Sequence, residues 1–109
     1  MESRKEHEKM KAERAIEKML VANIRHIRPQ TAEWLTEGGY QNMMYEKRDG
    51  DLYGWFLSIN LDEPDSYTSA DIPDDLRDVF AAAAAEHCWW VCLDPEGFEI
   101  DSLLLYDWD

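Results

Sequence analysis

The sequence predicts an α+β domain, and three features of the chain support this assignment. Residues 52–59 place large apolar side chains at every second position, the period of a strand with one buried face. An Asp49-Gly50 pair precedes them, a dipeptide typical of a tight hairpin between antiparallel strands. Residues 73–87 instead place apolar residues at intervals of three and four, the period of a helix with one buried face.

The N-terminal third predicts a long helix, a strand and a short helix. Residues 2–20 are rich in Glu, Lys, Arg, Met and Ala and lack Gly and Pro, so they favour a helix. This extra N-terminal helix is polar in its first half, and its apolar stripe consists of Ala12, Ile16, Met19 and Leu20. Residues 21–27 predict a strand. Pro29 then begins a helix through about Glu37, which the pair Gly38-Gly39 ends.

The rest of the chain predicts three strands and one well-defined helix. The strands are expected at residues 40–47, 52–59 and 88–93, and a long loop at Asn60–Asp71. The helix has Pro73 in its first turn, and its inward stripe is Leu76, Val79, Phe80, Ala83 and His87. Residues 98–109 form an acidic and aromatic C-terminal tail with room for one more edge strand.

After the first helix, the elements follow the order β-α-β-β-α-β. This is the ferredoxin-like pattern, in which both helices cover one face of an antiparallel sheet. We therefore expect a single domain, 1–109, in which residues 1–20 are a helical extension and residues 21–109 an acidic α+β core.

Charge is unevenly distributed along the chain. Residues 1–28 carry eight basic and five acidic side chains, whereas residues 29–109 carry three basic and nineteen acidic ones. A protein surface with this much negative charge repels phosphate groups, and direct binding of nucleic acid is therefore disfavoured. It attracts basic protein surfaces, including those that hold nucleic acid. The alternative is that the charge serves solubility alone.

Motifs of catalysis and metal binding are missing from the sequence. The three histidines have no zinc-ligand spacing, and neither a phosphate-binding glycine loop nor a nucleophile elbow is present. On a strand, Cys88 and Cys92 would lie about 13 Å apart, too far for a disulfide, so we expect buried free thiols in a reducing cytoplasm. His87 beside Cys88 is a weak indication of a thiol nucleophile, because neighbours on a strand point to opposite faces. We expect a non-catalytic protein without metal or cofactor.

The N-terminus lacks the apolar segment of a secretion signal, and the apolar runs are too short to cross a bilayer. These features predict a cytoplasmic protein without membrane contact.

From about residue 24 to the end, the chain resembles a family of small uncharacterised bacterial proteins that phages, plasmids and other mobile elements often encode. The resemblance lies in the stretches Ile24–Leu35, Leu52–Phe56 and Ile72–Leu76, in the Trp-rich strand, and in the ending Tyr106-Asp107-Trp108. It implies a mobile-element protein that acts against a host system, and it transfers no catalytic residues.

Our leading hypothesis is an inhibitor that mimics nucleic acid and occupies the basic groove of a host defence complex, as anti-CRISPR and anti-restriction proteins do. The expected partner-binding residues lie in the long loop and at the start of the following helix: Asp62, Glu63, Asp65, Tyr67, Asp71, Asp74, Asp75 and Asp78. Tyr67 is the expected aromatic anchor, and the acidic residues take the place of phosphates.

The alternative is an interaction or assembly module, including an antitoxin-like one. It would pair with itself, as a homodimer, or with another protein. Its contact surface would be the N-terminal helix or an aromatic sheet face containing Trp55 or its neighbours and one of Trp89 and Trp90.

Overall fold

The computed structural model describes residues 16–49 and 52–108. Their elements follow the order β1 (Lys18–Asn23), η2 (Ile24–His26), α2 (Pro29–Thr36), β2 (Met43–Asp49), β3 (Leu52–Ser58), α3 (Asp65–Thr68), α4 (Asp74–Ala85) and β4 (Cys88–Asp94). The predicted α+β class is confirmed.

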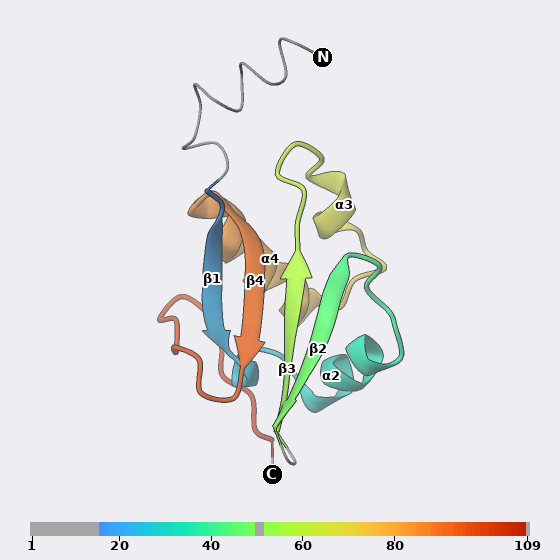
Figure 1. The fold of residues 1–109 in the computed structure, drawn as a ribbon, viewed down its shortest axis with the longest axis vertical. Helices are drawn as coiled ribbons and strands as arrows, with labels where there is room; N and C mark the ends of the chain where they lie inside the picture. Colours follow the sequence, from blue (N-terminus) through green and yellow to red (C-terminus); the bar gives the residue numbers. More distant parts are fainter. Residues whose placement is uncertain (1–15, 50–51, 109) are drawn as a thin grey trace.

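The four strands form one mixed sheet in the order β1-β4-β3-β2 (Figure 1). β4 is antiparallel to β3 but parallel to β1, with Leu20 opposite Val91 and Ala22 opposite Leu93. The sheet is therefore not the purely antiparallel one that the ferredoxin-like pattern predicted. The chain order of strands and helices alone does not decide which strand lies beside β1, because that choice depends on tertiary packing.

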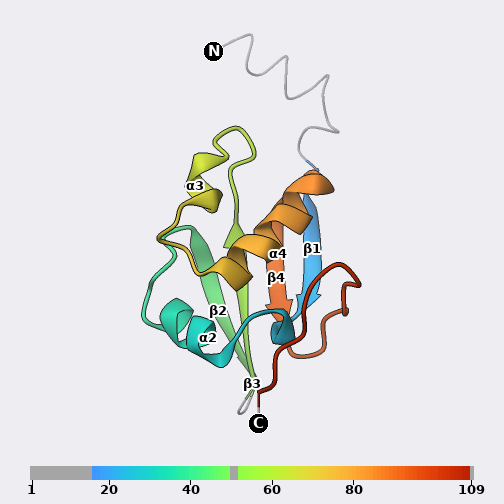
Figure 2. The same cartoon turned by 180° about the vertical axis from the view of Figure 1, so that it is seen from behind.

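The helices lie on one face of the sheet (Figure 2). α4 packs its inward stripe of Leu76, Val79, Phe80 and Ala83 against this face, and all four side chains are buried. The small Ala83 allows the helix to approach the strands closely. The core of the described residues lies in this layer, where Trp55, Leu57 and Ile59 continue it on the β3 side.

Further predicted features differ in the structure. The strand expected at residues 21–27 is shifted: β1 spans Lys18–Asn23, and Ile24–His26 form a short 3-10 helix. The predicted helix at 2–20 lies mostly outside the described residues, and its end is wrong because β1 begins at Lys18. His87 is not part of the inward stripe. The helix ends at Ala85, and His87 adopts a left-handed backbone with φ of 58° and an exposed side chain. Trp55 is buried, so it does not belong to an exposed aromatic patch.

The C-terminal tail packs along the end of the sheet instead of forming a further strand. Its contact with the sheet begins at Phe98, which makes an isolated parallel bridge to Ala22. The Asn23 amide donates to the Phe98 carbonyl at 2.9 Å. Further along, the Tyr106 amide donates to the Arg25 carbonyl and the Trp108 indole donates to the Ile27 carbonyl. The tail thus lies on the same side of the sheet as the helices (Figure 2).

Gly97 allows the tail to approach β1. A Cβ atom at this position would lie 2.4 Å from the Ala22 carbonyl oxygen and 2.9 Å from the Asn23 nitrogen. Both are backbone atoms, which no rotamer change can move aside. We expect Gly97→Ala to lower the free energy of unfolding by about 1–3 kcal/mol, the usual cost of overpacking. Urea unfolding followed by Trp fluorescence measures this change. The control Glu96→Ala alters an exposed side chain in the same turn and should change stability by less than about 0.5 kcal/mol.

Candidate functional site: exposed carboxylates beside an open groove

Exposed carboxylates follow one segment of the chain, from the end of β3 to the first turns of α4. Asp62, Glu63 and Asp65 lie at and before α3, and Asp71 lies between α3 and α4. All four are exposed. The outward face of α4 continues this acidic segment with two further exposed carboxylates, Asp74 and Asp78, which are one helical turn apart.

Few of these carboxylates are neutralised by a basic neighbour. Within residues 16–49 and 52–108, none of Asp62, Glu63, Asp65, Asp71 and Asp78 forms an ion pair. The nearby Arg77 directs its Nε hydrogen to the Ile72 carbonyl oxygen at 3.0 Å. The segment therefore presents negative charge that a basic partner could meet.

Asp74 differs because it binds a cation of the protein itself. Arg28 donates from Nη1 to Asp74 Oδ1 at 2.7 Å, and this hydrogen bond holds the pKa of Asp74 below its usual value. The guanidinium of Arg28 also lies 4.6 Å from the centre of the Tyr106 ring. Asp74 is thus engaged with Arg28, and it offers a partner less charge than Asp78 does.

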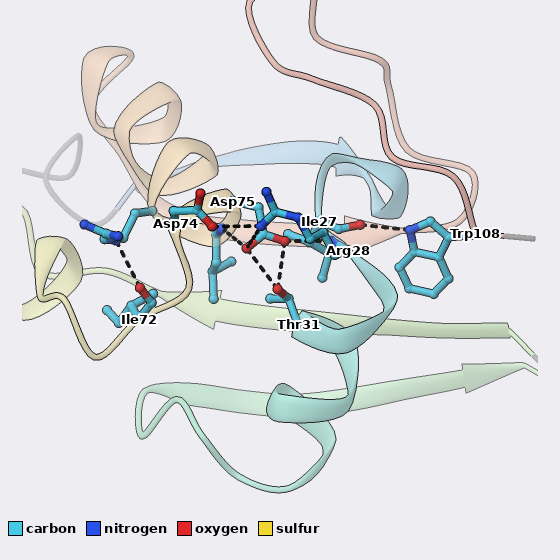
Figure 3. A network of polar contacts seen from close by, with 9 residues as sticks. Ile27, Arg28, Thr31, Ile72, Asp74, Asp75 and Trp108 are labelled. Carbon is cyan, nitrogen blue, oxygen red and sulfur yellow. Dashed lines mark hydrogen bonds and ion pairs between the residues drawn. The ribbon is translucent and has the colours of Figure 1, made fainter.

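Asp75 is buried, so a partner cannot contact it, contrary to the sequence prediction. Its carboxylate accepts from the Arg28 amide at 2.6 Å and from the Thr31 hydroxyl at 2.7 Å (Figure 3). Arg28 is the N-cap residue of α2, and its side chain makes no cap hydrogen bond. Asp75 of α4 therefore satisfies a free amide at the start of α2, which is the task of a capping side chain. The role of Asp75 is to join two helix N-termini.

Tyr67 is also buried and cannot serve as the aromatic anchor that the sequence suggested. Its ring meets that of Phe80 edge-on at a centroid distance of 6.5 Å. Tyr40 contacts the same ring from 5.1 Å. Tyr67 thus fixes α3 to the core. The carboxylates around it remain exposed.

Sequence reasoning missed an open groove between α4 and the C-terminal tail. The groove has a volume of about 360 Å³ and is lined by Asp78, Ala81, Ala82, Ser102, Leu103 and Leu104. One wall is the outward face of α4, and the other is the tail. The run of three leucines at 103–105, in an acidic and aromatic tail, was the signal that could have indicated an apolar wall.

His26 holds the groove's tail wall in place. The Ile100 amide donates to His26 Nε2 at 2.8 Å, so this nitrogen carries no proton. The hydrogen therefore lies on Nδ1, which donates to the Leu104 carbonyl at 2.8 Å. One neutral imidazole thus fixes two points of the tail, four residues apart.

The thiols are not arranged for nucleophilic catalysis. Cys88 and Cys92 are both buried, and burial raises the pKa of Cys88 above its usual value. A raised pKa means less thiolate at neutral pH. We expect both thiols of the native protein to react with an aromatic disulfide reagent at less than about one hundredth of the rate seen in urea. An equally fast reaction of one thiol in the native protein would contradict this prediction.

The described residues also offer no obvious metal centre. Among them, no three His, Cys, Asp or Glu side chains come together in a way that could hold an ion. None of the helices in this part of the chain has the length and apolar character required to cross a bilayer.

The structure thus shows a small α+β domain with a segment of exposed carboxylates. Residues 19–108 match the model of the C-terminal domain of a family of unknown function, DUF5983, and the chain belongs to this family. The resemblance to an uncharacterised family, inferred from the sequence, is thereby confirmed. No curated protein and no solved structure shows a significant match to the chain.

Proposed function

We propose that the protein is a non-catalytic acidic inhibitor that occupies a basic, nucleic-acid-binding surface of another complex. The observation that supports this proposal is the segment of exposed carboxylates at 62–78, five of which have no basic partner among the described residues. Carboxylates in such an arrangement can take positions that phosphates would occupy on a basic groove. The target class that fits is a host defence complex of the CRISPR or restriction type, and the protein would come from a phage or another mobile element.

The test is capture of a partner from host lysate with two variants of equal charge. The first changes Asp62, Glu63, Asp65, Asp71 and Asp78 to Asn or Gln. The matched control changes Glu33, Glu37, Glu86, Glu96 and Glu99 to Gln, five exposed carboxylates that lie elsewhere on the molecule. Both variants remove five negative charges, so they differ only in where the charge is lost.

We expect the wild type and the control to capture a nucleic-acid-binding complex, and the first variant to lose it. Mass spectrometry identifies the complex, and a nucleic-acid-binding assay then shows whether the protein inhibits it. Association should weaken steeply as salt rises, because exposed charges are screened. Equal capture by both variants, or capture independent of salt, would contradict mimicry by this surface.

An assembly module remains the second candidate, and one observation favours it. The sheet face opposite the helices is not covered by any described helix (Figure 1). On its β1 side, Met19 and Val21 are 39% and 36% exposed, although both are large and apolar. Beside them, the half-buried Trp90 donates its indole hydrogen to Glu17 at 2.8 Å.

Solution mass decides whether this face forms a homodimer. In that case the wild type would show twice the monomer mass in light scattering at high concentration, and Val21→Lys would return it to the monomer. A monomeric wild type across the concentration range would exclude self-assembly through the sheet. The version of this candidate that uses the N-terminal helix rests on residues outside the described part of the chain.

A further inference from the structure

The groove between α4 and the tail brings the carboxylate of Asp78 close to the apolar side chains Leu103 and Leu104. The outward face of α4 carries two carboxylates in its first half, Asp74 and Asp78, and two alanines in its second half, Ala81 and Ala85. All four residues are exposed. Asp74 is paired with Arg28. Ala82 lines the groove beside Ala81. Because these side chains are small, the space next to Asp78 stays open.

The opposite wall exposes apolar surface that is held by backbone contacts. Leu104, which lines the groove, is 69% exposed, and its neighbour Leu105, which lies outside the lining, is 49% exposed. Leu104 cannot turn away freely, because its carbonyl oxygen accepts a hydrogen bond from the buried His26. Leu103, next to it, packs partly into the core. The wall is therefore preorganised, which lowers the entropic cost of binding.

We infer that this groove accepts an apolar side chain from a basic segment of a partner protein, whose Lys or Arg side chains pair with Asp78. This inference rests on the proposed function. It names an apolar contact that would add binding affinity to the attraction between opposite charges. A volume of about 360 Å³ lies at the lower end of the range for ligand sites, roughly 300–1,000 Å³, and suits one or two side chains.

The charge around the groove selects a basic protein over other occupants. Asp78 lines the groove, and Asp101 precedes the lining residue Ser102, so phosphate groups are repelled here. None of the groove-lining residues is basic, and the nearby Arg28 is engaged by Asp74 and Tyr106. A partner segment with an apolar side chain next to Lys or Arg matches this lining, in which Leu103 and Leu104 lie near Asp78.

The experiment uses the full ¹⁵N-labelled chain and two synthetic peptides of equal length and equal positive charge. One peptide has two central leucines between its Lys and Arg residues, and the other has serines at those positions. We expect the leucine peptide to bind about tenfold more tightly or better, which is the effect of burying one leucine side chain. Its binding should shift the amide resonances of the groove-lining residues.

Two matched variants locate the contact on α4. Ala81→Trp fills the groove and should weaken binding of the leucine peptide about tenfold or more. Ala85→Trp adds the same side chain one turn further along, outside the groove lining, and should leave binding unchanged. Asp78→Asn should weaken both peptides, and its effect should disappear at high salt.

Other outcomes separate this inference from the proposed function. Equal affinity for the two peptides, or resonance shifts confined to residues 62–71, would overturn the groove inference and leave charge mimicry in place. Failure of both peptides to bind at low salt would also overturn it. The lysate capture with the two five-fold variants decides the proposed function independently of these peptides.

Discussion

Replacing Asp75 with alanine is expected to lower the free energy of unfolding by about 3 kcal/mol. The change removes a buried carboxylate that accepts from the Arg28 amide and the Thr31 hydroxyl, and it leaves both donors without this partner. Hydrogen bonds to a charged acceptor contribute about 1.5–3 kcal/mol, and an unsatisfied buried donor adds its own desolvation cost. Of the contacts between the start of α2 and the start of α4, the ion pair of Arg28 with Asp74 would then remain.

Chemical unfolding in urea, followed by Trp fluorescence, measures this loss. The matched control is Asp78→Ala, which removes an exposed carboxylate one turn further along α4 and should change stability by less than about 0.5 kcal/mol. A double-mutant cycle with Thr31→Val should give a coupling energy of about 1 kcal/mol, because the two groups bond directly. A loss below about 1 kcal/mol for Asp75→Ala would show that the network is not structural.

The sequence contained a signal for the role of Asp75. Its position falls one helical turn before the buried Val79 and two turns before the buried Ala83, so it lies on the inward stripe of α4. Asp74 and Asp78 share the outward stripe instead. Asp74 and Asp75 are neighbours in the first turn of α4, but one side chain is exposed and the other is buried. The difference follows from the face of the helix on which each residue lies. The partner of Asp75 was not visible, since Arg28 and Thr31 are more than forty positions away.

Local signals predicted local structure well. Pro29 and Pro73 mark the starts of α2 and α4, and the two strands on either side of Asp49-Gly50 pair as an antiparallel hairpin. β4 was indicated by its apolar run, which begins at Cys88. Each of these predictions depends on residues that are neighbours in the chain.

Long-range contacts could not be predicted in the same way. The parallel pairing of β1 with β4 joins residues about seventy positions apart, and its register follows from burial of Ala22 and Leu93 in a shared core. The groove depends on the tail folding back along α4, which no periodic pattern in the tail indicated. Tyr67 looked exposed in an acidic loop, but a four-residue helix turns its ring onto Phe80.

Replacing His26 with alanine is expected to release the C-terminal tail and to lower the free energy of unfolding by about 2–4 kcal/mol. The side chain is buried, so its removal leaves a cavity in the packed end of the sheet. It also removes two of the hydrogen bonds that hold the tail, one from the Ile100 amide and one to the Leu104 carbonyl. The groove should lose its second wall as a result.

Hydrogen exchange distinguishes release of the tail from general destabilisation. In His26→Ala the Ile100 amide should lose its protection, whereas amides in the centre of β4 should follow the global stability. His87→Ala is the matched control, because it removes an exposed imidazole from the end of α4 and should change stability by less than about 0.5 kcal/mol. If His26→Ala keeps the Ile100 amide protected, the tail is held by its other contacts, chiefly those of Tyr106 and Trp108. In that case His26 would fill space in the core, and leucine-peptide binding should survive its removal.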